Sequence, residues 1–146
     1  MAITIAELLD DCKTTIAGVS GLGTTGQVVW PEPEVVPPFG TFVYLTYGPG
    51  QVTQGNIEDT LHQVNIHVCT TYTGAYSEQY ASSIDYALKA QRAFRGNVVV
   101  AGNAVMTDQA TIETPQLMTW GETRLVQCIV RMFFQTVDDV VTEIVQ

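Results

Sequence analysis

The feature that most constrains the fold is a long run near the C-terminus, Arg124 to Gln135, composed largely of strand-forming residues. Side chains in a strand point alternately to the two faces of its sheet. One set of alternate positions in this run is apolar, and so are most of the positions between them: Val126, Cys128, Val130, Met132, Phe134 and Leu125, Ile129, Phe133. A strand that is apolar on both faces is typical of the middle of a sheet covered on both sides. We therefore expect a sheet with this run at its centre.

Other segments supply partners for this strand. Thr41 to Tyr47 and Leu61 to Thr71 are rich in β-branched and aromatic residues and are predicted strands. The second alternates, with one face predicted to be core and the other polar: Val64, Ile66, Val68 against Gln63, Asn65, His67. A short Val98 to Val100 strand and a Gly102-Asn103 turn follow. The segment around Ile112 is expected to pair antiparallel with the last run across Trp120-Gly121.

Two helices are predicted. The first has a capping box at Thr4 and Glu7, a hydrophobic staple of Ile3 with Leu8, and an end at Gly18; its apolar face is Ile5, Leu8, Leu9, Cys12 and Ile16. The second runs from Tyr76 to Arg95, with Tyr80, Ile84, Ala87, Leu88 and Phe94 at helical spacing. Lys89, Arg92 and Arg95 complement its C-terminus, which is a simpler account than a basic binding stripe. The expected fold is α+β, a single domain over residues 1–146, with a mostly antiparallel sheet packed against two helices.

The sequence Gly21-Leu22-Gly23-Thr24-Thr25-Gly26 matches the G-x-G-x-x-G pattern of dinucleotide-binding loops. That pattern holds a phosphate only when a strand leads into it and a helix leads out. Here a predicted helix precedes the glycines and an extended segment, Gln27 to Pro31, follows them. The order is reversed, so we expect a flexible turn and no nucleotide site; the role of Gly18 to Gly26 is left unassigned.

No set of residues indicates a metal or a catalytic centre. His62 and His67 have opposite side-chain directions on one predicted strand, so they cannot share a metal ion. Cys69 shares a face with His67, yet no third ligand is offered at a recognisable spacing, and nothing local activates a Cys–His pair. The acidic pairs Asp10-Asp11, Glu58-Asp59 and Asp138-Asp139 lack a calcium-loop pattern. We expect no catalytic, cofactor-binding or metal-binding residue, no cofactor, and no enzymatic activity.

Composition limits the partners. The chain has 15 acidic and 6 basic residues, a net charge of −9, which disfavours tight binding to DNA because phosphates are neutralised by Lys and Arg. Charged residues make up only 14%, which suits a subunit whose surface is covered in an assembly. The 3 cysteines, Cys12, Cys69 and Cys128, fit no disulfide framework and favour a reducing compartment. No run is long enough for a membrane helix, so we expect a soluble protein made in the cytoplasm.

Two further segments are candidate contact elements, and a third, the Pro-rich segment, is predicted to be a connector. Pro31 to Pro38 is a stiff extended connector, with a proline-recognition ligand as the alternative. Gly48 to Asp59 is expected to be a long polar loop that contacts a partner. In residues 137–146, Val137, Val140, Val141 and Ile144 form one helical stripe, which predicts a C-terminal arm. Sequence leaves open whether the arm packs within its subunit or against a neighbouring component; we favour the neighbour.

The order of these elements resembles that of the tail terminator (tail completion) proteins of long-tailed bacterial viruses, the minor tail protein U type. The likeness includes the crossing that ends in Pro37-Pro38 and the strand opened by Leu61-His62-Gln63-Val64, and it spans nearly the whole chain. It implies a virion protein, assembled in the host cytoplasm, whose homohexameric ring caps the tail tube, stops its polymerisation and joins the head connector.

The resemblance also implies that DNA passes through the lumen of the ring without specific binding, which suits an acidic subunit. Two alternatives stay open. One is a neck or head–tail connector adaptor of the same virion, and the other is a small ligand-binding or enzymatic α+β domain.

Overall fold

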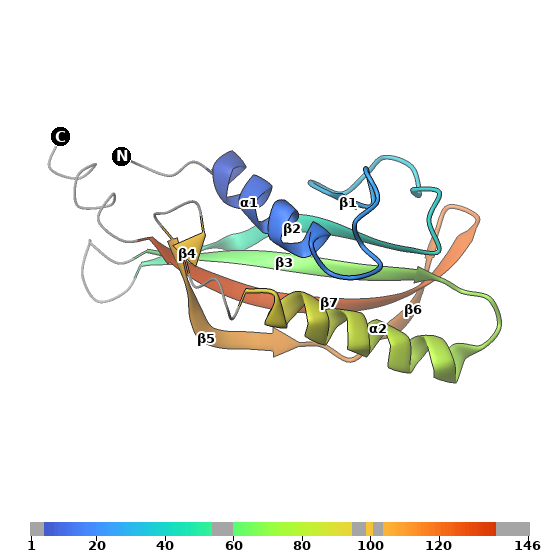
Figure 1. Cartoon of the computed structure of the whole chain (residues 1–146). Coiled ribbons are helices and arrows are strands. Elements are labelled where there is room, and N and C mark those ends of the chain that lie inside the picture. Colours follow the sequence, from blue (N-terminus) through green and yellow to red (C-terminus); the bar gives the residue numbers. More distant parts are fainter. Residues whose placement is uncertain (1–4, 54–59, 95–98, 101–103, 137–146) are drawn as a thin grey trace, which may run out of the picture.

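The fold is a sheet with two helices on one of its faces (Figure 1). The computed structural model describes residues 5–53, 60–94, 99–100 and 104–136. The helices are α1 (Ile5–Ala17) and α2 (Tyr76–Arg92). The strands are β1 (Val28–Val29), β2 (Thr41–Thr53), β3 (Thr60–Thr71), β4 (Val99–Val100), β5 (Ala104–Ile112), β6 (Gln116–Trp120) and β7 (Thr123–Thr136). This confirms the predicted α+β class.

The seven strands form one sheet in the order β1-β2-β3-β7-β5-β4, with β6 also paired to β7. Only the pair β1 and β2 is parallel, so the sheet is mostly antiparallel as predicted. One edge of β7 pairs with β3 from Leu125 to Thr136. Its other edge is shared, because β5 pairs with the C-terminal part and β6 with the N-terminal part. The prediction that Arg124 to Gln135 is the central strand is confirmed.

The main core lies between the sheet and the helices, on the side we call the helix face. The predicted face of α1 is buried at Leu8, Leu9, Cys12 and Ile16, whereas Ile5 is 37% exposed. The sheet contributes Val64, Ile66 and Val68 from β3, and Cys128, Val130, Met132 and Phe134 from β7. The ring of Phe94 meets that of Phe134 edge-on at 5.5 Å.

Helix α2 differs from the prediction. It ends at Arg92, and small or polar residues form its buried face: Gln79, Ser83, Ala87 and Ala90. The larger predicted positions Tyr80, Ile84 and Leu88 are only half-buried. Small side chains let the helix axis approach the sheet closely, and this displaces the larger ones to the flanks.

The opposite side of the sheet, which we call the open face, is covered by other described residues at one end. There Phe42, Tyr44, Cys69 and Leu125 form a second cluster, against which Val36 and Phe39 of the Pro-rich segment pack, with Val29, Met118 and Trp120. Further along β7, Ile129, Arg131 and Phe133 are half-buried. Among the described residues, cover on both faces of β7, as expected, is present at its Leu125 end.

The glycine segment after α1 confirms the reversed order, with a helix before it and β1 after it. Leu22 is fully buried in the main core. The Gln27 side chain donates from Nε2 to the carbonyl oxygens of Gly21 (2.7 Å) and Thr41 (2.8 Å), and its Oε1 accepts from the Thr24 N–H (3.2 Å). These contacts tie the turn to the start of β2.

The prediction of a loop from Gly48 to Asp59 is wrong for its first half, because β2 continues to Thr53. Pairing with β3 is interrupted between Tyr47 and Gln51 and then resumes. Gly48, at φ 114°, takes a backbone conformation that favours glycine, so the irregularity is accommodated there. Residues 54–59, the C-terminal arm 137–146, the capping box at Thr4 and the Gly102-Asn103 turn lie outside the described residues.

Candidate functional site

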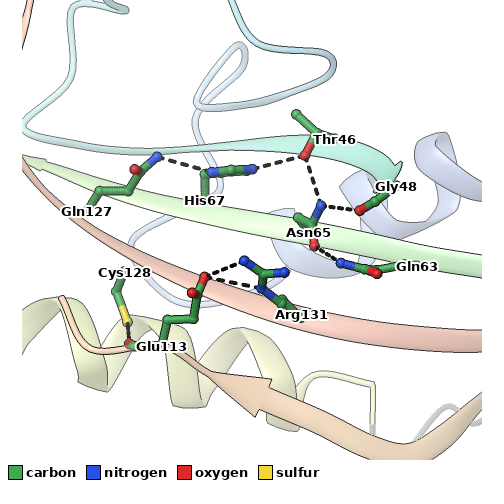
Figure 2. Close-up of polar contacts among 9 residues, drawn as sticks. All are labelled: Thr46, Gly48, Gln63, Asn65, His67, Glu113, Gln127, Cys128 and Arg131. Carbon is green, nitrogen blue, oxygen red and sulfur yellow. Dashed lines mark hydrogen bonds and ion pairs between the residues drawn. The ribbon is translucent and has the colours of Figure 1, made fainter. Parts of the chain in front are cut away.

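A network of uncharged polar side chains occupies the open face beyond the apolar cluster (Figure 2). We call it the polar network, and its members come from β2, β3 and β7: Thr46, Gln63, Asn65, His67 and Gln127. The strands are in register here, since Cys69 lies opposite both Phe42 and Gln127, and His67 lies opposite both Tyr44 and Ile129. Alternation along β3 places Gln63, Asn65 and His67 on this face, as predicted.

His67 is held at both ring nitrogens. Gln127 Nε2 lies 3.1 Å from Nδ1, and Thr46 Oγ1 lies 2.9 Å from Nε2. An amide nitrogen can only donate, so Nδ1 accepts and the ring proton is on Nε2, where it is donated to Thr46. The phenol ring of Tyr44 stacks on the imidazole, with centroids 4.2 Å apart and planes 8° apart.

The same geometry keeps His67 neutral. Burial lowers the pKa of His67 to about 4, with Glu113 opposing the shift and Arg131 adding to it. Protonation would place an N–H of the imidazolium against the N–H of Gln127. His67 is thus a neutral structural group at pH 7, and its one ring proton, on Nε2, is donated to Thr46.

Asn65 extends the network toward the far end of β2. Its Nδ2 donates to the Gly48 carbonyl (2.5 Å) and lies 3.4 Å from Thr46 Oγ1, and its Oδ1 accepts from Gln63 Nε2 (2.8 Å). The interruption in the β2–β3 ladder is therefore spanned by a side chain. This satisfies a carbonyl at the point where the ladder is broken.

One ion pair borders the polar network. Arg131 on β7 donates from Nε (3.2 Å) and Nη2 (3.1 Å) to Glu113 Oε2, and both side chains are about two-fifths exposed, at 43% and 39%. The Glu113 backbone is also fixed, because its N–H donates to the Ile129 carbonyl (2.9 Å). The pair adds no net charge to the open face.

His62 lies on the other side of the sheet, as predicted. Its Nδ1 is 2.7 Å from the Tyr47 hydroxyl, and burial lowers its pKa. Cys69 does share a face with His67, and both approach Gln127 Nε2, at 3.8 Å and 3.1 Å. Within the described part of the chain, no group of three or more His, Cys, Asp or Glu is placed to hold a metal ion.

The three cysteines are buried and free. Burial raises the pKa of the Cys69 thiol to about 12 and that of Cys128 to about 11, and it raises the pKa of Cys12 as well. A thiol acts as a nucleophile only as the thiolate, which these sites disfavour at neutral pH. The arrangement therefore holds uncharged, hydrogen-bonded side chains in place on one face of the sheet, and it supplies no activated nucleophile.

Sequence reasoning located only part of this site. The alternation in β3 indicated the polar side, but Thr46, Gln127 and the pair of Glu113 with Arg131 were not singled out. Thr46 is 21 positions from His67 and Gln127 is 60, so their contact depends on strand register. A single polar Gln127 between the apolar Val126 and Cys128 was the one available signal.

Comparison with known proteins gave a match by structure alone. No family model and no curated protein matches the sequence. A chain of the solved structure described as "Virion of native gene transfer agent (GTA) particle" aligns with a TM-score of 0.52 and 14% identity, covering 92% of this chain and 99% of that one. The fold is therefore shared over almost the full length of both chains.

Neither described helix has the length and apolar character that crossing a bilayer requires.

Proposed function

We propose that the chain is a structural virion protein, a tail terminator that forms a homohexameric ring on the end of the tail tube. In this role it stops tube polymerisation and joins the tail to the head connector. DNA passes through the lumen without specific binding. The protein then has no enzymatic activity and needs no cofactor, and it resides in the tail or neck of the particle.

The observation that carries the proposal is the likeness to a chain of a gene transfer agent virion, which covers 92% of this chain and 99% of that chain. Nearly complete coverage of both chains means that the two share a fold over almost their full lengths. The resemblance of the element order to tail terminators supplies the particular role within such a particle.

The charges and the open face support a passive assembly role. A net charge of −9 opposes binding to DNA, as a conduit requires. The one described histidine on the open face is hydrogen-bonded at both nitrogens, and the cysteine beside it has its pKa raised to about 12. These groups stabilise a surface and are poorly suited to catalysis.

Deleting the gene from the particle that encodes it tests the proposal. Without a terminator the tube continues to polymerise, so electron microscopy should show tails far longer than normal and few joined particles. Complementation with the intact gene should restore tail length. Tails of normal length beside unjoined, DNA-filled heads would identify a neck adaptor, and normal infectious particles would reject both virion roles.

A further inference from the structure

Three tyrosines and an arginine form a stack on the helix face, at the end of the sheet where β3 leads into α2. The rings of Tyr72 and Tyr76 are 6.3 Å apart and those of Tyr76 and Tyr80 are 5.9 Å apart, both edge-to-face. The Arg124 guanidinium carbon lies 5.0 Å from the Tyr72 ring centroid. We call these four residues the aromatic stack.

The aromatic stack is accessible. Tyr76 is 38% exposed, and Arg124 is exposed beside it. No carboxylate among the described residues forms an ion pair with Arg124, whose described partner is the Tyr72 ring. Tyrosine and arginine are, with tryptophan, the residues enriched among those that contribute most to binding between proteins.

The Pro-rich segment presents complementary groups on the other side of the sheet. It packs inward on the open-face cluster through Val36, and the adjoining Phe39 packs there too. Its outward side carries Val35, which is 76% exposed, and the exposed acidic residues Glu32 and Glu34. Among the described residues, Val35 is the most exposed large apolar side chain.

We propose that the aromatic stack of one subunit binds the Pro31 to Pro38 segment of the next copy of this chain. Prolines restrict the backbone of this segment before it binds, so little conformational entropy is lost when it docks on an aromatic surface. Val35 then packs on the tyrosines, and Glu32 or Glu34 pairs with Arg124.

The two surfaces lie on opposite faces of one subunit. Arg124 alternates with Leu125, which is in the open-face cluster, so Arg124 and the stack belong to the helix face. A contact between two different surfaces of identical subunits is head-to-tail, and it closes into a ring when the rotation permits. The inference rests on the proposed ring and names the contact that builds it.

Thiol cross-linking tests the contact. We would place V35C and Y76C in one chain, assemble particles with it, and treat them with a short bis-maleimide. The buried native cysteines Cys12, Cys69 and Cys128 serve as the unreactive background, checked with the unaltered protein. A ladder of covalent oligomers up to the hexamer is expected. The matched control is V35C with T14C, because Thr14 is exposed on α1 away from the stack; it should give no ladder.

Mixing chains that carry only V35C with chains that carry only Y76C should give cross-linked dimers and nothing larger. Cross-linking of V35C chains with each other would indicate a two-fold contact and overturn the proposal. A charge exchange provides a second test: R124E should reduce the ladder on the order of tenfold, and adding E32R and E34R should restore it. Restoration is an outcome that a folding defect would not produce.

Failure here is distinguishable from failure of the proposed function. A ring seen at the tail end without the V35C–Y76C ladder overturns the contact and leaves the terminator role intact. The ladder, together with normal tail length after gene deletion, supports the contact and rejects the role. Particles with no ring and no ladder reject both.

Discussion

The ring of Tyr44 lies flat on the imidazole of His67, with centroids 4.2 Å apart, and both side chains bind the same Gln127 amide nitrogen. One residue from each of β2, β3 and β7 is thereby joined on the open face. The apolar cluster ends at Tyr44 and the polar network begins at His67. This contact is therefore the boundary between the apolar cluster and the polar network on that face.

This boundary should make stability depend on pH. The folded-state pKa of His67, about 4, is below the ordinary value of 6.5, so the unfolded chain binds the proton more readily. The stabilising contribution is fully present above about pH 6.5 and is lost as the pH falls toward 4. Denaturant unfolding at a series of pH values should show a shallower decline for His67→Gln than for the unaltered protein.

His62 is a second buried histidine whose pKa is lowered, and its hydrogen-bond partner is Tyr47, outside the polar network. Its signals must be told apart from those of His67. Ring nitrogen chemical shifts should show His67 as the neutral form with its proton on Nε2. A positively charged His67 at pH 6, or identical pH profiles for the protein and its His67→Gln variant, would contradict this prediction.

Two threonines of neighbouring strands should respond oppositely to replacement by valine. Thr70 Oγ1 is buried without a hydrogen-bond partner in the described structure, so Thr70→Val removes an unsatisfied hydroxyl and should stabilise by about 1 kcal/mol. Thr46→Val removes the acceptor of the His67 proton and should destabilise by about 1–2 kcal/mol. Chemical denaturation measures both, and a loss of stability in Thr70→Val would show that its hydroxyl has a partner.

The periodic patterns predicted most of the fold and the polar side of β3, but not the contacts between strands on the open face. The alternation in β7 and β3 reflects burial of whole strands, so it located the central strand and the helix face. The extension of β2 past Tyr47 was missed because Gly48-Pro49-Gly50 is typical of a loop, and only pairing with β3 keeps it in the sheet. The partners of His67 were missed because register, not local sequence, brings Thr46 and Gln127 to it.

Gln27 should contribute more to stability than an exposed glutamine such as Gln116 does. It is 7% exposed and donates to two backbone carbonyls, those of Gly21 and Thr41. Gln27→Ala leaves both acceptors without this donor and should lower the free energy of unfolding by about 1–3 kcal/mol. Gln116→Ala, at an exposed site on β6, should change it by less than about 0.5 kcal/mol. Equal effects would mean that the Gln27 contacts contribute little.

Replacing the turn glycines Gly21 and Gly26 by alanine should destabilise the protein for different reasons. Both have positive φ, 93° and 85°, so either substitution strains the backbone by about 1–2 kcal/mol. A Cβ at Gly26 meets nothing within 4 Å, whereas one at Gly21 would lie 2.9 Å from the Tyr86 hydroxyl oxygen. Gly21→Ala should therefore be the more destabilising substitution.

Removing the Tyr86 hydroxyl separates the steric clash at Gly21→Ala from the backbone strain. In the Gly21→Ala background, Tyr86→Phe should recover part of the lost stability, because the nearest clashing atom is gone and the next ring atom is 3.3 Å away. In the Gly26→Ala background the same change should recover none. A double-mutant cycle on thermal or denaturant unfolding gives the coupling. Zero coupling between positions 21 and 86 would show that Tyr86 moves aside freely, and that the glycine is required only by its backbone angle.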